Sequence, residues 1–507
     1  MKKFVALSFV AILILAFGAT VYGQEKAPAL EFKPFGFIDA QTFWYVNVTG
    51  ANPAAGIYNA WGIGTSFDAA GKPSGALDKN TAYLESRARL GFNMIMGKDV
   101  SGTILFEMDS AKWGDDTQST AQRNIMGYWA ADRAAVEIKN VYIDFGVPLI
   151  PVPITLRVGL QGLGYRPAVL MATDGMGISA GIKLGSNVFI APFWAKPLEN
   201  NVSNSDDVDV YGLRAQVALG SMTIGGYALN FNMNTYPIVS GLAAPLNDSA
   251  NITWYGLYTD GKLGPVNVNF DAIFDYGKVK PVSGSTSPNV KYQGWAIRAA
   301  VDYPIEKLNI GLTGAYGSGA DTKKTGALGL PGANAFNPGT NSSKVGSYVI
   351  PPGSESGAAF GESIVFHSSS VNRGNTGIGN SINYTQMGRG GLGGAWYTKL
   401  YAGYKVIPEY KATFQALYIG DTTKNGNTFG TARNAPYGPG DLKDDSNIGF
   451  ELDLINEIQI YRNLKYTIAG GILFAGNALD LYTGVAGVGN HNPKNPWLIT
   501  SNLTYSF

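Results

Sequence analysis

Cysteine is absent from the 507 residues of this chain, and histidine occurs twice, as His367 and His491. Without cysteine the chain forms neither disulfides nor thiolate metal sites, so other interactions must hold its fold together. A serine hydrolase needs a histidine base beside its serine, yet both histidines lie in predicted loops and there is no G-x-S-x-G motif. We therefore predict that the protein is not an enzyme and carries no cofactor.

Long apolar runs are also absent after the amino terminus. Met1–Lys3 is basic, residues 4–17 are almost entirely apolar, and small or tolerated residues stand at 21–23. The run falls short of the ~20 residues that a helix needs to cross a bilayer. This pattern is typical of a signal peptide cleaved after Gly23, so we predict a signal peptide over residues 1–23 and an exported protein.

The chain also has no excess of positive or negative charge. The chain carries 38 Lys or Arg against 37 Asp or Glu, which gives no indication of a nucleic-acid partner. Its mean hydropathy is near zero although it contains 24 Phe, 28 Tyr and 9 Trp. Such an average is expected where lipid-facing and water-facing side chains alternate along transmembrane strands.

Alternation with a period of two residues is what the sequence has in abundance. In residues 266–276, for example, valine, phenylalanine and tyrosine alternate with asparagine and aspartate. We count about 18 such segments from residue 35 onward, or about 16 if those near 176–184 and 187–195 form one hairpin too short to span a membrane. The segments near 134–145 and 250–261 do not show which of their faces is apolar.

The connections between these segments alternate in length. Those after even-numbered segments are short, and those after odd-numbered segments are nearly all long and polar, as in barrels with short periplasmic turns and long external loops. No backbone donor can stay unpaired in hydrocarbon, so the first and last strands must pair with each other. We predict an all-β fold with a periplasmic segment, 24–34, and a closed antiparallel transmembrane β-barrel, 35–507.

The carboxy-terminal segment, 497–507, carries a mostly apolar face that ends at Phe507. Leu503, Tyr505 and Phe507 on this face resemble the assembly signal that closes bacterial outer-membrane barrels. The resemblance implies that barrel-assembly machinery is a partner. We expect this strand to pair with the first strand near residues 37–46 and to turn its apolar face to lipid.

The whole chain resembles the porin superfamily of Gram-negative outer membranes. The resemblance rests on the exported precursor, the alternating connections and the aromatic carboxy terminus, and residues 136–145 and 157–161 also look similar to strands of large porins and alginate-export channels. It implies a location in the outer membrane, contact with its lipid, and passive diffusion of ions and small hydrophilic solutes, and it allows a homotrimer. The alternatives are a channel selective for a sugar or acidic oligosaccharide, and a scaffold barrel around an electron-transfer partner.

Charged side chains on the polar faces are the candidate site, because a barrel of about 16 to 18 strands encloses water. Arg87 and Arg89, with Glu85 on the same strand, should form ladders that cross the pore with Glu107 and Asp109 of the next strand. The lysines of the later strands should face that acidic group and create a transverse field. The alternative is that these residues are merely solvated. The predicted pore-lining residues are Glu85, Arg87, Arg89, Glu107, Asp109, Arg157, Arg214, Asp271, Asp275, Arg298, Lys399, Lys405, Lys411, Glu451, Asp453 and Lys465.

Two loop features remain open from sequence alone. The long loop 320–391 is rich in Gly, Ser, Asn and Pro, and it either folds into the pore or projects outward. Aspartates cluster at 115–116, 206–209 and 441–445, where they could hold calcium, but they match no EF-hand spacing. We predict solvated carboxylates and no metal site.

Overall fold

A computed structural model of the chain describes its structure in fifteen stretches. The predicted signal peptide, His491, and the aspartates at 115, 116, 441 and 444 lie outside them. The described residues are 29–47, 66–67, 73–74, 80–114, 125–126, 134–148, 150–200, 202–239, 248–285, 289–321, 344–356, 362–367, 384–424, 445–479 and 495–507.

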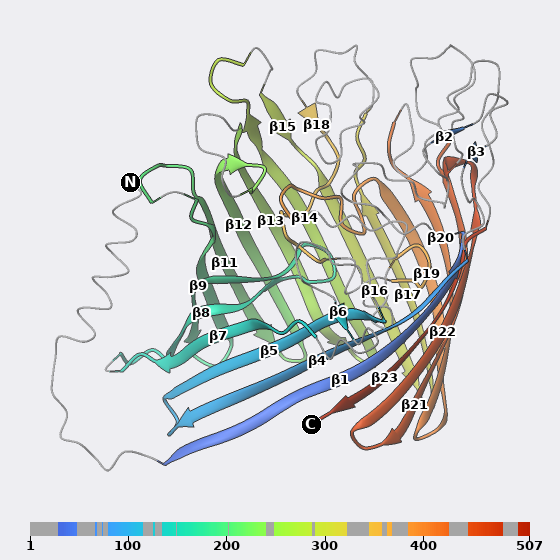
Figure 1. The fold of residues 1–507 in the computed structure, drawn as a ribbon, viewed down its shortest axis with the longest axis horizontal. Coiled ribbons are helices and arrows are strands. Elements are labelled where there is room, and N and C mark those ends of the chain that lie inside the picture. Colours follow the sequence, from blue (N-terminus) through green and yellow to red (C-terminus); the bar gives the residue numbers. More distant parts are fainter. Residues whose placement is uncertain are drawn as a thin grey trace.

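The described chain forms a closed antiparallel barrel of 18 long strands (Figure 1). Each strand pairs with the next in sequence, and β1 closes the ring by pairing with β23. The strands are β1 (Leu30–Val46), β4 (Asn80–Met96), β5 (Val100–Trp113), β7 (Glu137–Gly146), β8 (Ile154–Tyr165), β9 (Met171–Leu184), β10 (Val188–Leu198), β11 (Val208–Leu219), β12 (Met222–Tyr236), β13 (Asp248–Leu263), β14 (Val266–Lys280), β16 (Trp295–Ile305), β17 (Leu308–Gly317), β19 (Ala395–Ile407), β20 (Tyr410–Asp421), β21 (Asn447–Tyr461), β22 (Leu464–Ala475) and β23 (Trp497–Ser506).

Shorter elements lie in the long connections. Three of them extend the barrel sheet, namely β6 (Ile125–Met126), β15 (Val290–Tyr292) and β18 (Lys344–Val345), whereas β2 (Ser66–Phe67) and β3 (Pro73–Ser74) pair with each other. A single 3-10 turn, η2 (Asn477–Leu479), follows β22. Among the residues that the structure describes, no helix has the length and apolarity to span a bilayer.

The strand count of 18 and the order of the connections are confirmed. β9 and β10 are separate strands that pair with each other and, on their other edges, with β8 and β11. Turns such as 97–99, 220–221 and 462–463 are short, whereas the connections 47–79 and 318–394 are long. The turns after the even-numbered strands of the barrel, counted in chain order, therefore lie at one end, and the other connections, all long except a few such as 166–170, lie at the other.

The two strands whose facing the sequence left open have distinct physical reasons for their patterns. In β7, a bulge shifts the register against β5, so that the side chains of Lys139 and Asn140 both reach Asp174 and break the alternation. In β13, Ile252 and Trp254 are buried on the inner face, while Tyr255 is exposed on the outer one. Both faces of β13 are thus partly apolar.

The closing seam follows the predicted register. Residues 37–46 of β1 pair with residues 497–506 of β23, and Gly36 and Phe507 exchange two backbone hydrogen bonds of 2.9 and 3.1 Å. The side chains of Leu503, Tyr505 and Phe507 are exposed on the outer face. β1 begins at Leu30, earlier than the predicted residue 35, and residues 30–36 pair with β4 alone in the sheet.

Candidate functional site

Part of the long loop 320–391 lies inside the barrel. We call its described inner parts, residues 347–356 and 362–367, the inward segment. Tyr348 and Val349 are fully buried, and the Trp254 indole on β13 donates a 2.7 Å hydrogen bond to the Val349 carbonyl. The Val349 amide in turn donates to Asp275 of β14 at 3.2 Å. The first part of the inward segment is therefore fastened to the β13–β14 wall.

The same part also contacts the connection between β8 and β9. The Tyr348 hydroxyl donates to the Val169 carbonyl at 2.7 Å, and the Ser354 hydroxyl donates to the Leu170 carbonyl at 2.9 Å. Val169 and Leu170 are both buried. Two connections from different parts of the barrel thus meet inside it.

The second part of the inward segment is held by charge. The Glu362 carboxylate pairs with Arg298 of β16 at 2.5 Å and with Lys399 of β19. Its backbone carbonyl accepts a 3.1 Å hydrogen bond from the side chain of Gln415 on β20. Because these side chains are largely buried, the pairing is stronger than that of a surface salt bridge.

Two carboxylates of β21 hold the next three backbone amides. The amides of Val365 and Phe366 donate to Glu451 at 2.6 and 2.9 Å, and the Ile364 amide donates to Asp453 at 3.2 Å. The apolar side chains of residues 364–366 are fully buried. The anchors of the inward segment thus lie on neighbouring strands from β13 to β21, so the described inner parts of the loop 320–391 fold into the barrel and line this side of the lumen.

Arg166 joins the β8–β9 connection to the β13–β14 wall. Its guanidinium reaches Asp271 of β14 and Asp260 of β13, with Arg166 Nη1 lying 2.5 Å from Asp260 Oδ2, and it lies over the Tyr258 ring at 4.5 Å. These carboxylates raise the pKa of Arg166, although burial opposes them. Asp271 therefore serves as an anchor for this connection.

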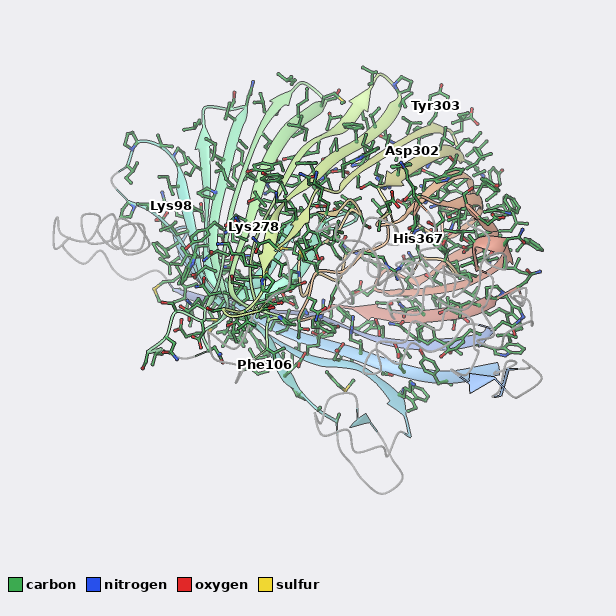
Figure 2. All side chains as sticks on the ribbon, turned by 90° about the horizontal axis from the view of Figure 1, so that it is seen from above. Lys98, Phe106, Lys278, Asp302, Tyr303 and His367 are labelled. Carbon is green, nitrogen blue, oxygen red and sulfur yellow. The ribbon has the colours of Figure 1, made fainter. Side chains whose placement is uncertain are left out.

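His367 ends the second described part of the inward segment, and Figure 2 shows it within the ring of strands. Its Nε2 lies 3.0 Å from the Gly391 carbonyl, which can only accept, so Nε2 carries the proton. Its Nδ1 then accepts from the Ser363 hydroxyl at 3.4 Å, and that hydroxyl accepts from the His367 amide at 3.0 Å. Burial lowers the pKa of His367 to about 4, against the opposing effect of the Glu362 carboxylate.

Acid is expected to release the inward segment. The pKa of His367 is about 4 when docked and 6.5 ordinarily. Docking is therefore fully stable above pH 6.5 and loses up to about 3 kcal/mol as pH falls through 4. Burial raises the pKa of Glu362, but Lys399 and Arg298 lower it to about 2, so its contribution is lost in the same direction at still lower pH.

Channel current between pH 7 and pH 4 measures this release. We expect the wild-type current to rise as the pH falls below about 5. The His367→Gln variant keeps a donor for Gly391 but cannot titrate, so its current should stay nearly constant. The charged groups facing the imidazole, Glu362 and Lys399, are present in both proteins. The same acid response in both would contradict a role for His367.

The predicted ladder on β4 and β5 is present. Arg89 pairs with Glu107 at 2.8 Å and Arg87 with Asp109 at 2.5 Å. Lys139 of β7 extends the ladder by bridging Glu107 at 3.0 Å and Asp174 of β9 at 2.8 Å. Glu85 lies on the same strand, opposite Gln41 and Lys112. The ladder runs along the wall from strand to strand and does not cross the pore.

The lysines of the later strands pair with carboxylates other than the acidic group of β4 and β5. Lys399 is paired with Glu362, and Lys411 and Lys465 both pair with Glu457 of β21, at 3.2 and 2.5 Å. Lys405 is exposed near the β19–β20 turn, in register with Lys411. The lysines nearest the short turns thus form a rim cluster with their own carboxylate.

Three predicted pore-lining acids are also covered. Asp275, Glu451 and Asp453 are buried, because the backbone amides of the inward segment and of Gly294 dock on them. They face inward as predicted, but they hold protein and are not open to lumen water. A carboxylate that accepts two or three backbone amides is a strong anchor for a loop.

A cavity of about 440 Å³ lies along the β8–β11 wall. Arg157 is paired with Asp144 at 2.7 and 2.8 Å, whereas Arg214 has no ion pair among the described residues and its Nε makes no hydrogen bond there. Lys183 adds a third cation to the lining. Three basic side chains against one carboxylate give this part of the lumen a positive charge.

Sequence reasoning missed several members of these networks. They have no distinctive local pattern, since Glu362 and Arg166 lie in loops, and Lys139 lies in the strand of poor alternation. Glu362 is one of three acids in the long Gly- and Ser-rich loop 320–391, which was the one available signal for it. The missed residues are Lys139, Arg166, Asp174, Asp260, Glu362 and Glu457.

A closed 18-stranded barrel with an apolar outer face and a charged, partly filled lumen has the architecture of large outer-membrane porins. No protein-family model and no curated protein matches the chain. Among solved structures it is similar to OccK11 (OpdR) of Pseudomonas aeruginosa, with 9% identity over 94% of this chain and 96% of that chain and a TM-score of 0.47. Similar values hold for the outer membrane protein opdK of the same organism (9%, 94%, 98%, 0.47) and for OccAB4 of Acinetobacter baumannii (11%, 94%, 98%, 0.45). The likeness is one of overall fold.

Proposed function

We propose that this protein forms an outer-membrane channel for passive diffusion of ions and small hydrophilic solutes. The observation that carries the proposal is a charged cavity on the inner wall of a closed 18-stranded barrel. A ring of this size leaves an aqueous space unless protein fills it. The outward apolar and aromatic side chains of its strands suit a lipid surrounding.

The inward segment acts as the constriction of this channel. Its anchors lie on β13, β14, β16, β19 and β21, so it narrows the lumen from that side and directs solutes past the β8–β11 wall. The same segment occupies space that a sheathed electron-transfer protein would need. The channel is therefore favoured over the scaffold barrel.

Conductance of the purified protein in planar bilayers tests the channel. Stepwise insertion events with a defined conductance are expected, and a folded barrel that never conducts would contradict the proposal. Added solutes of increasing size should reduce the current until they no longer enter. That cut-off distinguishes a general diffusion channel from a channel selective for a sugar or acidic oligosaccharide, in which one solute class would block at low concentration.

Arg214→Glu is expected to move ion selectivity toward cations. The substitution changes the cavity lining from three cations and one carboxylate to two of each. The focused potential near the passage should then lose its preference for anions. The reversal potential in a KCl gradient measures the change. Arg462→Glu alters the same charge in the exposed β21–β22 turn and should shift it far less. Equal shifts in both variants would place the passage elsewhere.

A further inference from the structure

The outer face of β14 changes from aromatic to basic side chains at one level along the strand. Phe274 and Tyr276 are exposed on the outer face, and the next outward side chains toward the long connections are Lys278 and Lys280. Aromatic side chains at the end of an apolar band mark the edge of the hydrocarbon region. On neighbouring strands, Trp295 and Tyr316 stack at 4.8 Å, and both are exposed.

Lysines stand in register across three strands above this edge. Lys278 of β14 lies opposite Lys291 of β15, and Lys291 lies opposite Lys344 of β18. We call these three residues the lysine row. Figure 1 shows β15 and β18 at the end of the barrel where the long connections lie, and Figure 2 labels Lys278.

The alternation of each strand directs the lysine row outward. Val279, Tyr292 and Val345 are buried on the inner face, whereas Lys291 and Lys344 are exposed. The lysines and these buried residues occupy alternate positions, so their side chains leave the sheet on opposite sides. The lysine row is therefore part of the surface that surrounds the barrel, not of the lumen.

Like charges directly opposite each other destabilise a sheet, because such side chains lie about 5 Å apart. Among the described residues, no carboxylate pairs with the lysine row or with Lys280. Asp248, at the same end of β13, accepts instead from the Val282 amide. A surface that gathers ammonium groups at the level of lipid headgroups is complementary to anions held at that level.

We propose that the lysine row and Lys280 bind lipids of the outer leaflet whose headgroups carry net-negative phosphate groups. This inference rests on the proposed membrane location, with the long connections on the outer side. Ammonium groups bind phosphate as point charges, and several in a row engage a headgroup with more than one phosphate. The exposed aromatic side chains below them contact the acyl chains of the same lipids. The lipid is thus held at both ends.

The test uses the full chain in nanodiscs of phosphatidylcholine with a minor share of lipid A. One arm contains lipid A with two phosphates, and the other contains the dephosphorylated form with the same acyl chains. Mass spectrometry counts lipid A retained per barrel after transfer to detergent. We expect the wild-type protein to retain the phosphorylated form at least about fivefold better, and less so at high salt.

Variants test whether the lysine row itself, and not the total charge of the protein, causes the preference for phosphorylated lipid A. Replacing Lys278, Lys291 and Lys344 with Gln should abolish the preference, and replacing them with Arg should preserve it. Replacing three lysines at or beside the short turns with Gln removes the same charge and should change nothing; these are Lys98, Lys262 and Lys307. An unchanged preference in the first variant, or equal retention of both lipids by the wild type, would overturn the proposal.

Folding and conductance are measured on the same samples. All variants should migrate as folded barrels and conduct equally, because none of these lysines faces the lumen cavity. If the protein does not conduct but keeps its lipid preference, the proposed channel function is contradicted and the lipid-binding proposal stands. Capture of an acidic protein without any discrimination between the two lipids would also overturn the lipid assignment.

Discussion

Glu362→Gln is expected to raise single-channel conductance several-fold. The Glu362 carboxylate lies between Arg298 and Lys399, whose side chains are 13% and 11% exposed. Removing one partner of a buried ion pair destabilises the structure by about 3–5 kcal/mol, since the remaining charges stay unpaired. This destabilisation applies only to the docked state of the inward segment, in which Arg298 and Lys399 are buried. Its second part should therefore leave the wall and widen the passage, which single-channel recording in planar bilayers would show.

Glu457→Gln is the matched control for this prediction. Glu457 also lies between two cations, Lys411 and Lys465, but these residues form the rim cluster and do not contact the inward segment. Its conductance should stay close to that of the wild type. Wild-type conductance in Glu362→Gln would mean that the segment does not limit the passage.

A disulfide can restore the constriction in the opened variant. A Cβ built on Gly471 of β22 would lie 2.9 Å from the Ile364 Cβ, closer than the ~3.8 Å of a disulfide, and 2.1 Å from Asp453 Oδ1. The Asp453 side chain must therefore turn aside and the two backbones must move apart for the disulfide to form. The chain has no native cysteine, so Ile364→Cys with Gly471→Cys introduces a single pair. In the Glu362→Gln background, oxidation should lower the conductance and reduction should raise it. Insensitivity to both would show that the second part of the segment does not move.

Strand number and facing follow from the sequence because they depend on neighbouring residues. Each lipid-facing side chain must be apolar wherever water is absent, so alternation marks the outer face along the membrane-spanning part of a strand. The exception in β13 shows the limit of this reasoning. Near the long connections, Asn251 and Thr253 lie on its outer face, while Ile252 and Trp254 pack inward against the loop. There the chain buries apolar groups against protein, and the alternation inverts.

The partners of the lumen charges do not follow from the sequence. Facing places Glu451 and Asp453 inside the barrel, but it does not say whether water or backbone amides meet them. That depends on a loop more than 80 residues away along the chain, Ile364 being 89 residues from Asp453. The local pattern of a Gly- and Ser-rich loop carries no such information. The sequence predicts solvent-facing acids and lysines on opposite walls of the pore, whereas the structure has anchored loops on one side and a cationic cavity on the other.

Deletion of Phe507 is expected to prevent assembly of the barrel while export continues. The deletion removes both backbone hydrogen bonds between Phe507 and Gly36, and with them the last rung of the closing seam. Two hydrogen bonds of about 1 kcal/mol each shift a folding equilibrium roughly 30-fold. Heat-modified migration on gels measures the folded fraction.

The Phe507→Ala variant distinguishes the contribution of the backbone hydrogen bonds at the closing seam from recognition of the aromatic ring by assembly machinery. It keeps the backbone bonds to Gly36 and removes the ring, which lies 5.8 Å from that of Tyr505 and is exposed on the outer face. In refolding without cellular factors, Phe507→Ala should fold nearly as well as the wild type and the deletion should not. In cells both should fail if assembly machinery recognises the ring. If the deletion refolds as well as the wild type without those factors, the seam does not depend on its last rung, and the terminal residue acts through recognition alone.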